Sequence, residues 1–402
     1  MRETRKYLAP VIVATAALLL AGCAPSSASG GGAGGGGGDA DASAVDVSII
    51  YSETGPLAAY GAAYKAGLEA GLDYATDGTN KAGGHPINIT YSDDAGDADK
   101  AVSLAKDAIG KGSTIIAGTV VSGIALALAE QAEQNKILYI SGPAAVDQIT
   151  GINDYTFRSG RQTYQDIATA GTFIGDPSGK KVVVFAQDTA FGQGNLAGVQ
   201  AVLGEKGADV SDVLVPEDAT EFTPFAQKVL AAKPDLVFVA WAGATSGAMW
   251  ESLQQQGVFD KTTVVTGLGD VATYEAFGAA SDKINFLNHY FPGATDNKAS
   301  KAMDAYLDEH GASADLFSPD GFNAGIMIAH AVEEGAGDVD AMVKSLEGFS
   351  FEGPKGTMTV RAEDHALLQP MFQAKLVQKD GKWVPELVKV VDAETVAPPV
   401  AG

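Results

Sequence analysis

The sequence predicts an α/β fold with two doubly wound parallel sheets, each sheet carrying helices on both faces. The first observation is an alternation of short β-rich segments with amphipathic segments of helical length, which begins at Val47 and is typical of repeated β-α-β units. The second is the length of this alternation. Roughly 350 residues follow it, more than one doubly wound domain usually holds, so we expect two lobes.

The expected strands are rich in β-branched and aromatic residues. The run Val182–Phe185 is apolar throughout, as in a strand that is buried on both faces of a sheet. In chain order the expected strands are Val47–Tyr51, Ile87–Tyr91, Thr114–Ala117, Ile137–Ile140, Lys181–Phe185, Leu236–Trp241, Thr262–Val265 and Ile284–Leu287.

The expected helices lie between these strands, where apolar residues recur at helical spacing. In chain order they are Ala59–Ala75, Ala98–Ile109, Ile124–Gln134, Gln165–Phe173, Asn195–Lys206, Phe225–Ala232 and Gly247–Gln255.

Composition excludes several classes of protein. The chain has 402 residues and a formal net charge of −23, which argues against a nucleic-acid partner because phosphate binding needs a basic surface. Hydrophobic residues make up 46% and charged residues 19%, as in a globular protein with a sizeable core. The single cysteine and five widely separated histidines lack the spacing of a metal site. We therefore expect no metal and no cofactor.

The first residues resemble an export signal. Arg2, Arg5 and Lys6 precede the apolar stretch Leu8–Leu20, which is short for a membrane span and has the proportions of a secretory signal peptide. The motif Leu20-Ala21-Gly22-Cys23 is similar to a bacterial lipobox. This resemblance implies removal of residues 1–22, acylation of Cys23 and anchoring to the cell membrane outside the cytoplasm. The alternative is a plain signal peptide with an incidental cysteine.

Residues 23–45 are expected to form a flexible tether. The segment is rich in Ser, Gly and Asp and contains no large apolar residue that could contribute to a core. Some twenty flexible residues reach roughly 25 Å on average, enough to hold a folded domain just off a membrane surface.

Several motifs together resemble the leucine/isoleucine/valine-binding family. The segment that follows the first strand, Tyr51-Ser52-Glu53-Thr54-Gly55-Pro56-Leu57-Ala58-Ala59-Tyr60-Gly61, is similar to the opening loop of these type I periplasmic binding proteins, which feed ABC importers. Further segments match in order: Tyr91–Ala95, Gly118–Gly123, Thr156–Ser159, Phe191–Gly194 and Pro234–Phe238. The resemblance covers roughly Val47 to Val391.

The resemblance implies two lobes joined by three hinge crossings, with a ligand in the cleft between them. The crossings are expected near residues 159–163, 288–293 and 369–374. Residues 46–160 and 293–370 would form lobe 1, and residues 161–292 and 371–397 would form lobe 2.

Ser122 and Gly123 follow an expected strand and begin an expected helix, the position where open α/β sheets bind ligands. The hydroxyl of Ser122 and the backbone N–H groups of the helix start suit a carboxylate, and Ser122 aligns with a carboxylate-binding serine of the family. The alternative is a serine that only caps the helix. The family's carboxylate-binding threonine is missing from Ser141–Val146, so we expect the backbone N–H groups of Ala144 and Ala145 to serve there.

The resemblance assigns further residues to the cleft. Tyr60 and Phe191 align with cleft aromatics, and Trp241 lies one position from another, either as a lid over the ligand or as a core residue. Tyr164 is one of several polar residues at the first crossing, with Arg158 and Arg161, which either bind ligand or latch the closed form. Asp270 lies one position from the family's ammonium-binding glutamate. If it faces the cleft, an amino acid fits; otherwise a neutral amide or a carboxylate without an amine fits better.

The favoured function is therefore capture of a small amino acid or a related carboxylate or amide, and its delivery to ABC permease subunits without catalysis. One alternative is a ligand sensor of the same fold that signals to a partner. Another is a surface hydrolase, although the sequence shows no nucleophile elbow, phosphate loop or zinc-protease motif. The pair Asp93-Asp94 is interpreted as loop acids rather than as an acid–base pair.

Overall fold

A computed structural model describes residues 42–267 and 269–401, and the described part of the chain forms one compact unit. The predicted signal peptide, the lipidation site Cys23 and most of the predicted tether lie outside these residues. No helix in the described ranges has the length and apolar content that crossing a bilayer requires.

The first sheet has six strands in the order β2-β3-β1-β4-β5-β6. All neighbours pair in parallel except the short β2, which is antiparallel to β3. The strands are β1 (Val45–Tyr51), β2 (Lys81–Ala82), β3 (His85–Asp93), β4 (Ile115–Gly118), β5 (Leu138–Ser141) and β6 (Thr156–Arg158). Its helices are α1 (Ala58–Ala75), α2 (Ala98–Gly110) and α3 (Ser122–Asn135), with the short η1 (Asp147–Ile149).

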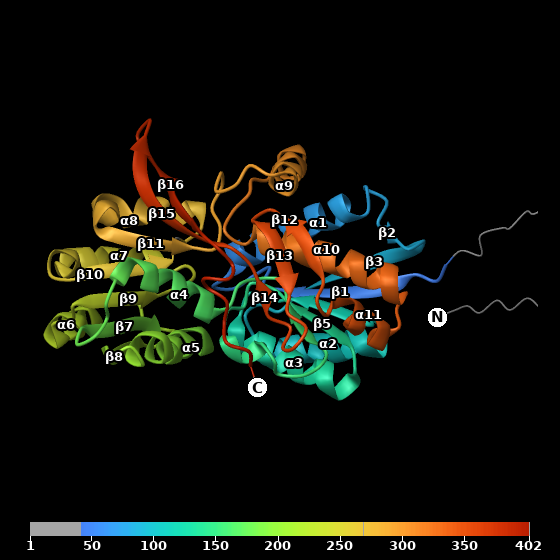
Figure 1. The fold of residues 1–402 in the computed structure, drawn as a ribbon, viewed down its shortest axis with the longest axis horizontal. Helices are drawn as coiled ribbons and strands as arrows, with labels where there is room; N and C mark the ends of the chain where they lie inside the picture. Colours follow the sequence, from blue (N-terminus) through green and yellow to red (C-terminus); the bar gives the residue numbers. More distant parts are fainter. Residues whose placement is uncertain (1–41, 268, 402) are drawn as a thin grey trace, which may run out of the picture. The chain divides into compact units, whose positions relative to one another are not determined.

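The second sheet has seven strands in the order β16-β15-β11-β10-β9-β7-β8, and it lies in the other half of the ribbon (Figure 1). The strands are β7 (Lys181–Gln187), β8 (Asp209–Val215), β9 (Leu236–Ala240), β10 (Thr263–Gly267), β11 (Ile284–Asn288), β15 (Met371–Lys379) and β16 (Lys382–Val391). Between them lie α4 (Thr163–Ile174), α5 (Ala190–Val199), η2 (Gln200–Gly204), α6 (Thr223–Ala232), α7 (Ser246–Gln255), η3 (Val258–Asp260), η4 (Val271–Thr273), α8 (Tyr274–Phe277) and η5 (Gly278–Lys283).

The predicted fold class is confirmed by two largely parallel sheets of the doubly wound type. In both sheets the strand order reverses beside the first strand, between β1 and β4 and between β7 and β9. The chain passes between the sheets three times: after β6, after β11 and between β14 (Leu367–Leu368) and β15. The lobe boundaries proposed from the sequence remain a prediction.

The structure adds elements that were not predicted from the sequence. Strand β8 lies at a sheet edge and buries only Val213 and Val215 of its seven residues, so it lacks the continuous apolar run of a central strand. The C-terminal β15 and β16 form an antiparallel hairpin that projects from the second sheet in Figure 1. The remaining elements are α9 (Lys298–Glu309), α10 (Ser318–Gly335), α11 (Val339–Leu346), β12 (Ser350–Gly353) and β13 (Gly356–Val360).

Helices α1 and α10 pack in unusually close backbone contact. A Cβ atom on Gly67 would lie 1.9 Å from the carbonyl oxygen of Ser318, and one on Gly321 would lie 1.9 Å from that of Tyr64. Only glycine allows such an approach. The contact brings the start of α1, which carries Tyr60, against Phe317 before α10, where the two rings meet edge to face at 4.9 Å.

Candidate functional site

A cavity of about 540 Å³ lies between the two sheets. Its walls come from the loops that follow the carboxyl ends of β1, β3, β4 and β5 on one side and of β7, β8, β9, β10 and β11 on the other. Ligands of open α/β sheets bind beyond the carboxyl ends of strands, near the point where strand order reverses. Both switch points, β1/β4 and β7/β9, face this cavity, so its position follows from the topology.

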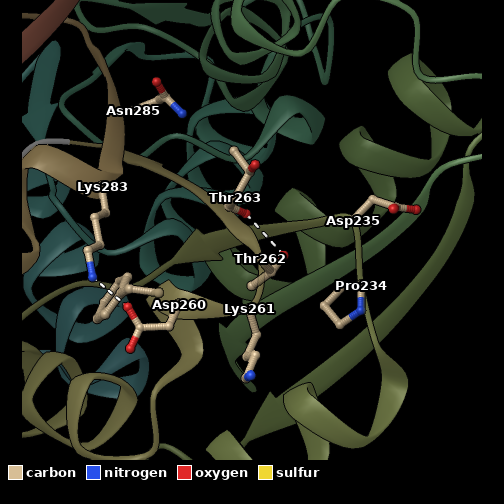
Figure 2. Close-up of a pocket in the computed structure, with 9 residues that line it drawn as sticks. Pro234, Asp235, Asp260, Lys261, Thr262, Thr263, Lys283 and Asn285 are labelled. Atoms are coloured by element: carbon tan, nitrogen blue, oxygen red, sulfur yellow. Dashed lines mark hydrogen bonds and ion pairs between the residues drawn. The ribbon is translucent and has the colours of Figure 1, made fainter.

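A second hollow of about 530 Å³ lies at the opposite edge of the second sheet, shown in Figure 2. It is lined by Pro234 and Asp235 before β9, by the start of β10, and by Lys283 and Asn285 at the start of β11. Figure 2 shows the ammonium of Lys283 beside the carboxylate of Asp260, with which it forms an ion pair. This hollow lies at the amino ends of the strands, whereas open α/β sheets bind ligands at the carboxyl ends. The topology therefore favours the interlobe cavity as the site.

The loops after β1, β3 and β4 are held together by Asp94. This carboxylate is fully buried and accepts hydrogen bonds from the hydroxyls of Ser52 (2.7 Å) and Thr119 (2.6 Å). Its neighbour Asp93 accepts from the backbone and hydroxyl of Thr54. Hydrogen bonds from Thr54 outweigh the opposing effect of partial burial and hold the pKa of Asp93 below its usual range. Both carboxylates therefore position the loops, in agreement with their interpretation as loop acids.

The start of α3 contributes Ser122 and Gly123 to the cavity wall. Ser122 is the first residue of α3, while the N-cap position belongs to Val121 and makes no side-chain capping bond. The alternative that Ser122 only caps the helix is therefore wrong. The N-terminal end of α3 therefore lies at the cavity wall, where the helix dipole favours an anion.

Aromatic side chains line much of the rest of the cavity. Tyr60 and Phe191, both predicted from the sequence, are among the lining residues. Trp241 also lines it, and its ring stacks on Phe185 at 5.4 Å while its indole N–H donates to the hydroxyl of Thr245 (3.0 Å). Trp241 therefore packs against the core and also lines the cavity, and its role as a lid over a ligand stays a prediction.

The remaining wall comes from the crossings between the sheets and carries the buried charges. Arg161 and Asp166 line the cavity, and Nε of Arg161 lies 3.2 Å from a carboxylate oxygen of Asp166, with both side chains 8% exposed. Nη1 of Arg161 donates to the carbonyl of Pro143 (2.7 Å). Burial raises the pKa of Asp166, and the positive charge of Arg161 opposes that rise. The two side chains therefore form a buried ion pair in the cavity wall.

The lobes touch around the cavity. A Cβ on Gly243, after β9, would lie 2.8 Å from the carbonyl oxygen of Pro56, after β1. The backbone N–H of Val271, after β10, donates to the carboxylate of Asp315 before α10 (3.1 Å). Burial, reinforced by the negative charge of Asp270, raises the pKa of Asp315 to about 6. These contacts join the two lobes beside the cavity.

Three predicted residues are not brought to the cavity surface. The N–H of Ala144 points to the carbonyl of Thr119 (3.4 Å), although Ala145 does line the cavity. Tyr164 packs against the core of the second lobe, and its backbone N–H donates to Asp147 (3.0 Å). Asp270 is the N-cap of η4 and accepts from the N–H of Thr273 (3.0 Å). Its carboxylate thus accepts a backbone hydrogen bond at the rim of the cavity, next to Gly269, which lines the cavity.

The two arginines of the first crossing have different roles. Arg158 is 1% exposed and donates to the carbonyls of Val146 (3.0 Å), Ala144 (2.7 Å) and Arg161 (3.0 Å). These bonds satisfy loop carbonyls that burial would otherwise leave unpaired. Arg158 therefore shapes the crossing, whereas Arg161 reaches the cavity.

Sequence reasoning missed His289 and Phe317. His289 directly follows β11, and the rule that placed Ser122 after β4 would have found it. Phe317 lies far along the chain from the strands that form the site and reaches the cavity through the α1–α10 contact. No local pattern marks it.

The fold and the interlobe cavity together define a two-lobed solute-binding protein. Comparison with known families is decisive: the family model described as "Periplasmic binding protein" matches residues 44–382, so the chain belongs to the periplasmic binding protein family. Membership places the folded part of the chain outside the cytoplasm.

Individual relatives agree with this membership. The chain is 27% identical over 351 residues to the Leu/Ile/Val-binding protein homolog 3 of Brucella melitensis, covering 85% of this chain and 93% of the relative. It is 31% identical to an ABC-type branched-chain amino acid transporter protein of Rhodopseudomonas palustris CGA009, with a TM-score of 0.74 and coverage of 89% and 99%.

A more distant structure shows the same fold. It is the solute-binding protein of an ABC transporter from Rhodopseudomonas palustris HaA2, solved in complex with p-hydroxybenzoic acid. The identity is 22% and the TM-score 0.80, with coverage of 87% of this chain and 97% of the relative.

Proposed function

We propose that this chain is an extracytoplasmic solute-binding lipoprotein that captures a small amino acid or a related carboxylate or amide and delivers it to the permease of an ABC importer. The observation that carries the proposal is the cavity between the carboxyl ends of both sheets, with the lobes in contact around it. The relatives support it, because one is named a Leu/Ile/Val-binding protein homolog and another was solved with an aromatic acid.

The chemistry of the cavity suits a small solute with one anionic end. The start of α3 provides N–H groups and the hydroxyl of Ser122 for a carboxylate, and the aromatic wall provides apolar surface. The acids Asp270 and Asp315 already accept backbone hydrogen bonds at the rim. This arrangement favours a carboxylate or amide over a ligand that depends on a strong ammonium site.

Isothermal titration of the purified folded chain tests the binding function. The panel comprises branched-chain and small amino acids, benzoates, short aliphatic acids and their amides. We expect at least one solute to bind with one-to-one stoichiometry. If none of them binds, and native mass spectrometry finds no retained small molecule, the proposed function is wrong.

The anchor and the importer need separate tests in cells. A Cys23→Ser variant should leave the membrane fraction, because it loses the thiol that the acyl chains would modify. Deletion of the gene should reduce uptake of the labelled solute that binds best. Retention of Cys23→Ser in the membrane would argue against a lipid anchor, and unchanged uptake would argue against transport.

A further inference from the structure

His289 is a cavity residue for which the proposed function has no role. It follows β11 at the second passage between the sheets and is 4% exposed, and its imidazole stacks on Phe317 with ring centroids 4.9 Å apart. Its side chain lines the cavity. Among the described residues, Nε2 of this ring has no hydrogen-bond partner. A buried, unsatisfied ring nitrogen at a ligand cavity is costly unless a ligand pairs with it.

The protonation of the ring follows from its surroundings. Burial lowers the pKa of His289 well below its ordinary value, and the positive charges of Arg161 and Lys355 lower it further, so the ring is neutral. A hydrogen bond with the backbone of Leu316 raises the pKa, as expected when a ring N–H donates to a carbonyl oxygen. Since Nε2 has no partner, the backbone of Leu316 is left to Nδ1, and a proton on Nδ1 leaves a lone pair on Nε2.

Arg161 provides N–H donors against the same phenylalanine ring. Its guanidinium carbon lies 5.5 Å from the centroid of Phe317, the same ring on which His289 stacks. Nη1 of Arg161 donates to Pro143, and Nε lies 3.2 Å from a carboxylate oxygen of Asp166. This wall therefore offers N–H donors and one lone-pair acceptor.

A hydroxyl group fits that combination better than a carboxylate. Its hydrogen donates to the lone pair of Nε2 of His289, and its oxygen keeps lone pairs for an N–H donor of the wall. A carboxylate would place its own lone pairs against Nε2. The carboxylate of the solute belongs instead at the start of α3.

We propose that His289 determines specificity, and that the solute is a small carboxylate that also carries a hydroxyl group, which donates a hydrogen bond to Nε2 of His289. This inference rests on the proposed function and deepens it. A neutral hydrogen bond to a buried acceptor that is otherwise unpaired raises the affinity about five- to tenfold.

Two pairs of probe solutes isolate the hydroxyl group. Threonine and valine differ by a hydroxyl in place of a methyl group, and 4-hydroxybenzoate and benzoate differ by a hydroxyl in place of hydrogen. Titration calorimetry at neutral pH should show the hydroxylated member of at least one pair binding about five- to tenfold more tightly to the unmodified chain. In His289→Phe, which keeps an aromatic ring against Phe317, the preference should fall to twofold or less.

His365 supplies a matched control. It is also buried and stacks on a phenylalanine, Phe157, at 3.9 Å, but its Nδ1 contacts the carbonyl oxygen of Thr156 (3.0 Å), and it is not among the residues that line the cavity. His365→Phe should keep the hydroxyl preference. His289→Gln, which retains an acceptor oxygen, should keep part of it, and thermal melting confirms that each variant is folded.

The inference is overturned if the unmodified chain shows no preference for either hydroxylated probe, or binds neither of them. It is also overturned if the preference survives in folded His289→Phe. If other solutes of the panel still bind, the proposed function stands without this inference. If nothing in the panel binds, the proposed function itself has failed.

Discussion

Gly243 controls how closely the two lobes approach, and Gly243→Ala tests that role. The residue has a φ of +85°, and an added Cβ would lie 2.8 Å from the carbonyl oxygen of Pro56 and 2.9 Å from Cδ2 of Leu57, both across the cleft. Optimal contacts between carbon atoms are about 3.5–4.0 Å. The lobes would therefore have to separate by about 0.5–1 Å at this point.

The substitution Gly243→Ala has two separate energetic costs. The left-handed backbone strain of alanine, about 1–2 kcal/mol, is local and lowers the free energy of unfolding whether or not ligand is bound. The clash with Pro56 opposes the approach of the two lobes, and overpacking of this kind costs about 1–3 kcal/mol. Because that second cost opposes closure, it should weaken ligand binding about 5- to 150-fold.

Titration calorimetry with the best-binding solute measures the affinity, and small-angle scattering measures how compact the liganded protein is. Gly247→Ala is a matched control, since Gly247 lies in α7 and its added Cβ would meet only Ala276, at 3.9 Å. It should bind ligand normally. If Gly243→Ala binds as tightly as Gly247→Ala, lobe contact at Gly243 has no part in ligand capture.

Three further predictions concern the site and its support. Ser122→Ala should weaken a carboxylate solute by about 1–3 kcal/mol in calorimetry, and unchanged affinity would remove Ser122 from the site. Gly321→Ala should lower the free energy of unfolding, measured in urea, by about 3 kcal/mol, as severe overpacking does. The reason is that its Cβ would lie 1.9 Å from a backbone oxygen. The control Gly171→Ala in α4, with nothing within 4 Å, should be neutral or stabilising by about 1 kcal/mol, so equal effects would contradict the packing argument. The raised pKa of Asp315, about 6, means that the native state keeps this proton while the unfolded chain has lost it, so raising the pH from about 4 to about 6 should lower the free energy of unfolding. Asp315→Asn should reduce that slope in denaturation curves at pH 4.5 and 7, and an identical slope would show that another group is responsible.

Much of the fold could be predicted because its signals are local. The apolar runs of β7 and β9 and the amphipathic pattern of α2 lie within single elements, where periodicity decides the structure. The edge strand β8 and the hairpin of β15 and β16 carry weaker patterns, since an exposed face tolerates polar residues. Their places depend on the neighbours with which they pair.

The site was predicted in part for the same reason. Ser122 and Phe191 lie just after strands, at helix starts, so strand order alone directs them to the cavity. Asp270 was expected as a possible ammonium partner, and the structure places it at the N-cap of η4, where one carboxylate oxygen accepts from the backbone N–H of Thr273.

The sequence by itself determined that this is a two-lobed α/β protein of the periplasmic binding protein family and which edge of its sheets carries the site. Only the tertiary structure decided what surrounds the solute. His289, Phe317 and Arg161 meet because three separate crossings and the glycine contact of α1 with α10 bring them together. Such contacts depend on long-range packing, and no periodicity within one segment encodes which distant side chains share a cavity wall.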